Sequence, residues 1–161
     1  MNKKSVSFFV SYAHANRSAK DKFLELFLEQ TGAAKRFKYS FWQDRDIAVG
    51  DDWDQSIKNA ITQTDFGLLL VSPSFLGSQY ITEKELPCYL ESGGKRCFPL
   101  MLAQVDFERQ DLKGLEKKQI FRLDSSDFKQ PRALNDLKLR RKEQFARELF
   151  AKIDDWLMEH F

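Results

Sequence analysis

The side chain with the clearest chemical potential in this sequence is the carboxylate of Glu85. It follows a wholly apolar segment, residues 66–71, after a short irregular stretch, and an aromatic residue, Tyr80, stands five positions before it. Open α/β folds bind ligands at the carboxyl edge of a parallel sheet, and this order of segments would bring Glu85 to such an edge. A carboxylate there can stabilise the positive charge that develops on a sugar ring when its glycosidic bond breaks.

The same glutamate also has a purely structural interpretation. Thr82-Glu83-Lys84-Glu85 has the S/T-x-x-E spacing of a capping box, in which Thr82 and Glu85 would satisfy the first backbone groups of a helix. Pro87 argues against this, because a helix that begins after Thr82 would place the proline beyond the first turn, where its missing N–H removes a hydrogen bond. A later helix start would free Glu85 from capping. The local pattern alone leaves both interpretations open.

Other polar and aromatic side chains are expected at the same edge of the sheet. Ser11 and Tyr12 end the first predicted strand, and Asp44 follows the second. Tyr80 or Trp53 could cover the flat face of a base, although packing against the core explains each of them equally well. Asp44 could serve only to order its own loop. These five residues are the candidate binding residues, and no metal ligands are expected with them.

The elements that must position these residues follow an alternation of strand and helix patterns along the 161 residues. This alternation predicts a single domain, 1–161, with an α/β flavodoxin-like, doubly wound parallel sheet of about five strands and helices on both faces. The expected strands are 5–11, 37–42, 66–71, 96–102 and 119–123. The expected helices are 17–30, a segment capped by Asp51 or Asp52, the segment that holds Glu85, and about 137–160. Pro99 predicts a bulge or an edge position for the fourth strand.

Composition excludes several classes of function. The net charge is only +2, which gives no reason to expect nucleic acid or an anionic membrane as a partner. No apolar run approaches the roughly 20 residues of a membrane span. Cys88 and Cys97 have no metal-binding spacing and are expected to be a buried, reduced pair, so we expect the cytoplasm as the location. His14 and His160, the two histidines, are expected to be solvated.

Three segments, in order, resemble the signature boxes of Toll/interleukin-1 receptor (TIR) domains. The first is Phe8-Phe9-Val10-Ser11-Tyr12-Ala13-His14. The second is Phe41-Trp42-Gln43-Asp44 with the loop that ends in Val49-Gly50 and then Trp53, similar to the second strand and BB loop of the family. The third, Leu68 to Phe75 with Ser78-x-Tyr80 and Glu85-Leu86, resembles the segment that carries the catalytic glutamate of NAD-cleaving members. The resemblance runs from about Ser5 to Leu102.

The third box departs from the pattern of many family members. Those have Trp-Cys before the glutamate, with the glutamate four residues after the aromatic. Here the aromatic is Tyr80, with Glu85 five residues on and Glu83 three residues on. Bacterial members with a tyrosine and the longer spacing look closer to this chain. The resemblance therefore assigns the catalytic role to Glu85 and leaves Glu83 as the alternative.

The resemblance implies two functions. The first is an NAD⁺ glycohydrolase that releases nicotinamide and leaves ADP-ribose or a cyclic isomer, as in bacterial antiviral defence. NAD⁺ would be its substrate, no cofactor would be needed, and Ser11, Tyr12, Asp44, Trp53 and Tyr80 would surround it. The second is a non-catalytic interaction module. In both, the family pattern implies self-association through the BB loop, Arg45 to Asp52, and through helix faces.

Overall fold

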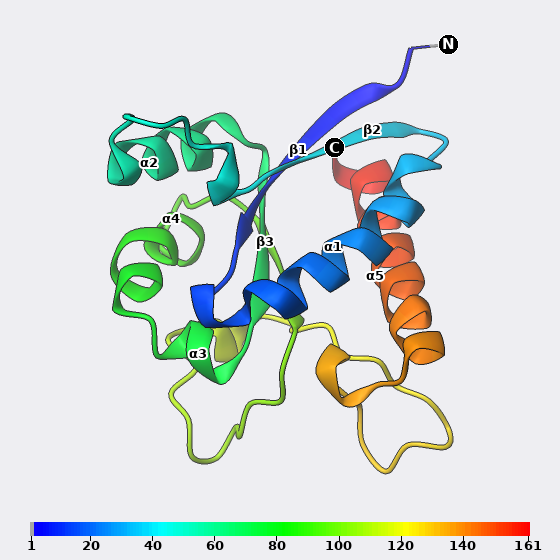
Figure 1. Ribbon diagram of the computed structural model, residues 1–161. Helices are drawn as coiled ribbons and strands as arrows, with labels where there is room; N and C mark the ends of the chain where they lie inside the picture. Colours follow the sequence, from blue (N-terminus) through cyan, green and yellow to red (C-terminus); the bar gives the residue numbers. More distant parts are fainter. Residues whose placement is uncertain (1) are drawn as a thin grey trace.

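A parallel sheet of four strands forms the centre of the molecule. The computed structural model describes residues 2–161 (Figure 1), and the strand order is β2-β1-β3-β4. The strands are β1 (Lys4–Ser11), β2 (Phe37–Trp42), β3 (Phe66–Val71) and β4 (Cys97–Met101). All neighbours pair in parallel, in the order that flavodoxin-like sheets use. The predicted α/β doubly wound fold is confirmed.

The strand count differs from the prediction of about five. Within residues 2–161 no fifth strand forms, because the segment 119–123 makes only isolated bridges, Leu100 to Phe121 in parallel and Leu123 to Arg132 antiparallel. The second bridge turns the chain away from the sheet after Phe121 has exchanged two hydrogen bonds with the β4 backbone, both of 2.9 Å. β4 is therefore the edge strand, which is one of the two positions that Pro99 predicted, because an edge tolerates a residue that lacks an N–H.

Helices cover both faces of the sheet (Figure 1). α1 (Arg17–Gly32) and α5 (Leu139–His160) pack on one face, while α2 (Trp53–Gln63), α3 (Pro73–Leu76) and α4 (Pro87–Leu90) lie on the other. Alternate side chains of β1 divide between two cores: Phe8 packs toward α1 and α5, and Phe9 packs toward α2. β3 is buried along its whole length, as its continuous apolar run predicts.

Local sequence explains where the helices around the cleft begin. The Asp52 side chain accepts a hydrogen bond of 2.8 Å from the Gln55 N–H, so the predicted cap of α2 is confirmed. Pro87 occupies the first turn of α4, where its missing N–H would have had no helical partner. Between β3 and α4, the residues Ile81–Glu85 form a turn of π-helix. The Leu86 N–H donates to the Ile81 carbonyl five residues back, at 2.8 Å.

The capping-box interpretation of Thr82 and Glu85 is wrong. The Thr82 hydroxyl donates to the Ser78 carbonyl at 2.9 Å, and it is Ser78 whose side chain accepts from a backbone N–H, that of Ile81, at 3.3 Å. Glu85 is the last residue of the π-helical turn, so it does not occupy a helix-capping position. Turns of this kind are often found at functional sites, where they redirect one side chain out of the regular helical phase.

Three further expectations can be compared with the described residues. Cys97 is buried, but Cys88 is exposed, so the expectation of a buried pair is wrong for Cys88. None of the helices within residues 2–161 is both long enough and apolar enough to pass through a bilayer. Over the same range, no three His, Cys, Asp or Glu side chains gather closely enough to hold a metal ion.

Candidate active site

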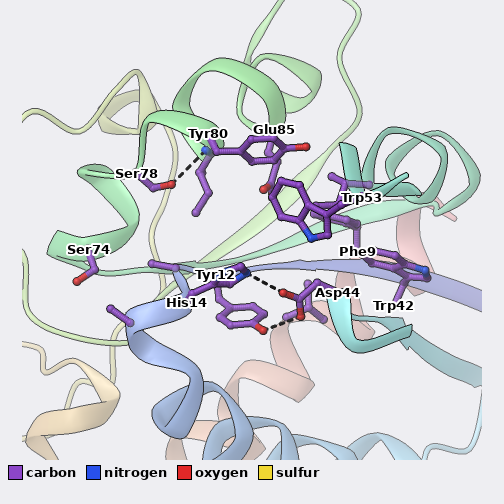
Figure 2. Close-up of a pocket in the computed structure, with 15 residues that line it drawn as sticks. Phe9, Tyr12, His14, Trp42, Asp44, Trp53, Ser74, Ser78, Tyr80 and Glu85 are labelled. Carbon is purple, nitrogen blue, oxygen red and sulfur yellow. Dashed lines mark hydrogen bonds and ion pairs between the residues drawn. The ribbon is translucent and has the colours of Figure 1, made fainter. Parts of the chain in front are cut away.

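A cleft of about 240 Å³ opens at the carboxyl edge of the sheet (Figure 2). Its lining comes from segments far apart in the sequence: the end of β1, the residues after β2, the first turn of α2, and the chain between β3 and α4. The labelled lining residues are Phe9, Tyr12, His14, Trp42, Asp44, Trp53, Ser74, Ser78, Tyr80 and Glu85. This is the position at which open α/β sheets bind their ligands.

Glu85 supplies a deeply buried carboxyl group to this cleft. The residue is only 6% exposed, and the Ser11 hydroxyl donates a hydrogen bond of 2.8 Å to its Oε1. Glu83, two residues earlier, is exposed and accepts a hydrogen bond of 3.0 Å from the Gln79 side chain instead. The π-helical turn therefore gives the two glutamates opposite environments, and Glu85 is the one that lines the cleft.

Burial raises the pKa of Glu85 from its ordinary value of 4.5 to about 7. The hydrogen bond from Ser11 opposes this by favouring the ionised form, and the negative charge of Asp44 adds to the rise. At neutral pH the carboxyl group thus lies near the midpoint of its titration. A positively charged ligand in the cleft would draw it toward the carboxylate, because an opposite charge favours the ionised form.

Asp44 is held on both of its carboxylate oxygens. The Tyr12 hydroxyl donates to Oδ1 at 2.6 Å, and the His14 Nε2 lies 2.8 Å from Oδ2 (Figure 2). Burial by itself would raise the pKa of Asp44, but the hydrogen bonds from Tyr12 and His14 outweigh it and lower that pKa. Burial and the neighbouring Asp44 raise the pKa of Tyr12 to about 12. Asp44 is therefore a fixed anion and Tyr12 a fixed donor in the wall of the cleft.

Two aromatic rings form the side of the cleft next to Glu85. The Trp53 and Tyr80 rings lie 4.5 Å apart between centroids and are tilted by 49°. The Tyr80 hydroxyl is occupied, since it donates to Asp54 Oδ1 at 2.8 Å. Trp53 remains 40% exposed at the mouth of the cleft. This arrangement leaves an indole surface available for a flat ligand beside a buried carboxyl group.

Most of the predicted site residues meet in one place. Tyr12, Asp44, Trp53, Tyr80 and Glu85 all line the cleft. Ser11 does not line it; its side chain lies behind Glu85, almost fully buried, and holds the carboxyl group. Five further residues that the figure labels around the cleft were not among the predicted binding residues: Phe9, His14, Trp42, Ser74 and Ser78.

His14 is the most consequential of the missed residues. It is exposed, as expected, but its ring also contacts Asp44 and lies edge-on to Trp53, 6.3 Å between centroids. Its place directly after a strand that ends at the carboxyl edge of the sheet could have indicated this. Phe9 and Trp42 stack at 5.2 Å and support the floor from the neighbouring strands.

These features define a doubly wound α/β domain with a buried carboxyl group in an aromatic cleft at the carboxyl edge of its sheet. The family model described as "TIR domain" matches residues 8–138, and the chain belongs to this family. The chain is also 34% identical over 105 residues to an uncharacterized protein, y4lF, of Sinorhizobium fredii. That match covers 63% of this chain and 31% of the relative, so the chain spans about a third of the length of the curated relative that it matches.

Proposed function

We propose that this TIR domain is an NAD⁺ glycohydrolase of the cytoplasm, which acts in bacterial antiviral defence. The observation that carries the proposal is Glu85, a carboxyl group that is 6% exposed and lines an aromatic-walled cleft. Some TIR domains have this activity. The substrate is NAD⁺, and the bond that breaks joins nicotinamide to its ribose.

The chemistry asks for little more than one carboxylate. When the C–N bond breaks, its electron pair moves to the ring nitrogen, and nicotinamide leaves as a neutral molecule. The ribose that remains is oxocarbenium-like, and the ionised Glu85 stabilises its positive charge in a water-poor site. Addition of water at C1′ with loss of a proton gives ADP-ribose, while attack by the ribosylated adenine of the same molecule gives a cyclic isomer.

The other cleft residues have roles that follow from their contacts. Trp53, with its exposed indole next to Tyr80, covers the face of the nicotinamide ring. Asp44, held by Tyr12 and His14, accepts hydrogen bonds from ribose hydroxyls or adds negative charge near the cationic sugar. Ser11 orients Glu85 from behind. The carboxylates of Glu85 and Asp44 favour a positively charged ligand over a neutral one.

The size of the cleft suggests that one copy encloses only part of the substrate. Its volume of about 240 Å³ is below the range of roughly 300–1,000 Å³ that is usual for pockets that enclose a drug-sized ligand. The nicotinamide and its ribose would be enclosed, and the adenosine half would lie outside. A second copy of the domain could cover it.

A second candidate function is an interaction module, with or without catalysis, that self-associates through the BB loop, Arg45 to Asp52, and helix faces. Domains of this family commonly associate with themselves or with other proteins. The observation in its favour is Val49, whose side chain is fully exposed, followed by Gly50 with a φ of +92°. An apolar side chain at the tip of a loop is suited to insertion into a neighbour.

The two functions can be separated by incubation of concentrated protein with NAD⁺ and chromatographic separation of nicotinamide, ADP-ribose and cyclic products. Release of nicotinamide in step with a ribosyl product supports the enzyme. Intact NAD⁺ at all protein concentrations leaves only the interaction module. If self-association completes the site, the rate per molecule rises with protein concentration, and Val49→Asp removes that rise without changing the fold. A constant rate per molecule contradicts this dependence.

A further inference from the structure

A second pocket lies between the β4 edge of the sheet and α5, and it is lined by other residues than the Glu85 cleft. It has a volume of about 460 Å³, compared with about 240 Å³ for the cleft, and the two share no lining residue. The pocket exists because the segment 119–123 bridges to β4 only once and leaves a hollow against α5. We call it the β4–α5 pocket.

Cationic side chains dominate the polar lining of the β4–α5 pocket. Arg96, Arg122 and Lys152 line it, and Asp124 is the acidic residue among its lining side chains. Within residues 2–161, none of the three cations takes part in an ion pair. The pocket therefore holds an excess of positive charge, whereas the chain as a whole is close to neutral at +2.

Aromatic rings, rather than carboxylates, hold the two arginines in place. The Arg96 guanidinium carbon lies 4.2 Å from the centre of the Trp156 ring, on which the His160 ring also stacks at 4.6 Å. The Arg122 guanidinium lies 5.1 Å from the centre of the Phe107 ring. Stacking orients a guanidinium but leaves its N–H edge free to donate. Arg96 is thus partly ordered before any ligand arrives, which lowers the entropy lost on binding, whereas Arg122 stacks on a ring that lines a different pocket.

Apart from Gln119 and Asp124, the remaining lining of the pocket is apolar. Pro99 of the edge strand, and Leu149 and Ile153 of α5, contribute to its lining. A simple inorganic ion would leave this surface wet. The volume lies within the range of roughly 300–1,000 Å³ of small-molecule sites. A ligand that uses the whole pocket would carry an anionic group at one end and an apolar or aromatic portion at the other.

We propose that the β4–α5 pocket binds a phosphorylated small molecule of about the size of a mononucleotide. Its phosphate is recognised by Arg96, because the guanidinium fork matches phosphate oxygens in pairs, and Lys152 of α5 adds a further charge. Its apolar portion rests on α5. This site is separate from the Glu85 cleft and does not depend on any activity of that cleft.

The three tryptophans, Trp42, Trp53 and Trp156, make a direct binding test possible by ¹H–¹⁵N NMR. Each indole N–H gives one cross-peak, which can be assigned with single Trp→Phe variants. Trp42 and Trp53 report on the Glu85 cleft and Trp156 on the β4–α5 pocket. Titration with AMP is expected to move the Trp156 peak to saturation, adenosine is expected to leave it in place, and inorganic phosphate is expected to move it only at much higher concentration.

Variants test whether the proposed cations are responsible. Arg96→Gln is expected to weaken AMP binding by about tenfold to 100-fold, and Lys152→Ala by about threefold to tenfold, on the basis of lost charge-assisted hydrogen bonds. Arg96 and Lys152 are both exposed, so neither variant removes a side chain from the core. Arg140→Ala, an exposed α5 residue outside the pocket, is the control and should bind as the wild type does.

Four outcomes would overturn the proposal. They are a Trp156 peak that does not move with millimolar AMP, equal movement with adenosine, equal affinity for inorganic phosphate and AMP, and unchanged AMP affinity in the Arg96 and Lys152 variants. Movement confined to Trp42 and Trp53 would assign AMP to the Glu85 cleft and would equally contradict a site at the β4–α5 pocket.

Discussion

Replacement of Glu85 by glutamine is expected to stabilise the folded protein at neutral and alkaline pH. The pKa of Glu85 is raised by burial from 4.5 to about 7. Between these values the folded protein keeps a proton on Glu85 that the unfolded chain has lost. Stability therefore falls as the pH rises from 4.5 through about 7, and the full loss is present above that window. Glutamine is neutral at every pH and avoids this loss.

The size of the effect follows from the two pKa values. At about 1.4 kcal/mol per pH unit, the interval from 4.5 to about 7 corresponds to about 3 kcal/mol above pH 7. At pH 5 the same relation leaves less than about 1 kcal/mol. The Ser11 hydroxyl, 2.8 Å from Oε1, can still donate to the amide oxygen of glutamine, so no hydrogen bond need be lost.

Urea unfolding at about pH 5 and pH 8.5 provides the assay, with the free energy of unfolding obtained by linear extrapolation. The Glu85→Gln variant should gain about 2–3 kcal/mol over the wild type at the higher pH and little at the lower. Glu83→Gln is the matched control, because Glu83 is exposed, and it should change stability little at either pH. A gain that is absent at pH 8.5, or equal at both values, would refute the reasoning, since neither result can come from the ionisation of a buried carboxyl group.

Three further predictions concern the site and its supports. The kcat/KM for NAD⁺ should rise with pH around pH 7, where Glu85 ionises. Ser11→Ala removes the hydrogen bond that favours the carboxylate, so it should move this rise to higher pH. A rise at the same pH in the Ser11→Ala variant would contradict the role of Ser11. Gly67→Ala should lower the free energy of unfolding by about 1–3 kcal/mol, because an added Cβ would lie 2.6 Å from the Tyr89 ring; an unchanged denaturation midpoint would show that the ring moves aside freely. Asp52→Ala should lose about 1 kcal/mol by uncapping α2, measured in the same way, whereas Asp52→Asn should keep most of it.

The sequence predicted the parts of the fold that depend on local patterns. β3 was recognisable because a continuous apolar run of six residues is typical of a strand buried on both faces. Pro99, which lacks an N–H, predicted a bulge or an edge position for β4, and the edge position is the one observed. The absence of the predicted fifth strand could not be foreseen, because the residues from 119 to 123 are apolar enough to extend the sheet. The chain turns away from the sheet after Phe121 because Leu123 pairs with Arg132. No local sequence pattern indicates this contact.

The site residues that directly follow strands could be predicted from the sequence. The direction of the glutamate side chains could not, because it depends on the π-helical turn. Tyr12 and Asp44 could be assigned to one edge because parallel strands end there together. The spacing of Glu83 and Glu85 could not be interpreted with a regular helix, since a π-helical turn decides which one faces the cleft. His14 was missed because its importance lies in a contact of 2.8 Å with Asp44, from a different strand end.

The central proposal is that the domain cleaves NAD⁺ and that the carboxylate of Glu85 stabilises the positive charge formed on the ribose. The most direct test is the rate of nicotinamide release by concentrated wild-type, Glu85→Gln and Glu83→Gln proteins. We predict that Glu85→Gln, although folded and more stable above pH 7, loses about 100- to 1,000-fold in rate, while Glu83→Gln keeps the wild-type rate. A Glu85→Gln protein that releases nicotinamide within about twofold of the wild-type rate would contradict the account, because an effect of at least tenfold is the minimum expected of an electrostatic catalyst.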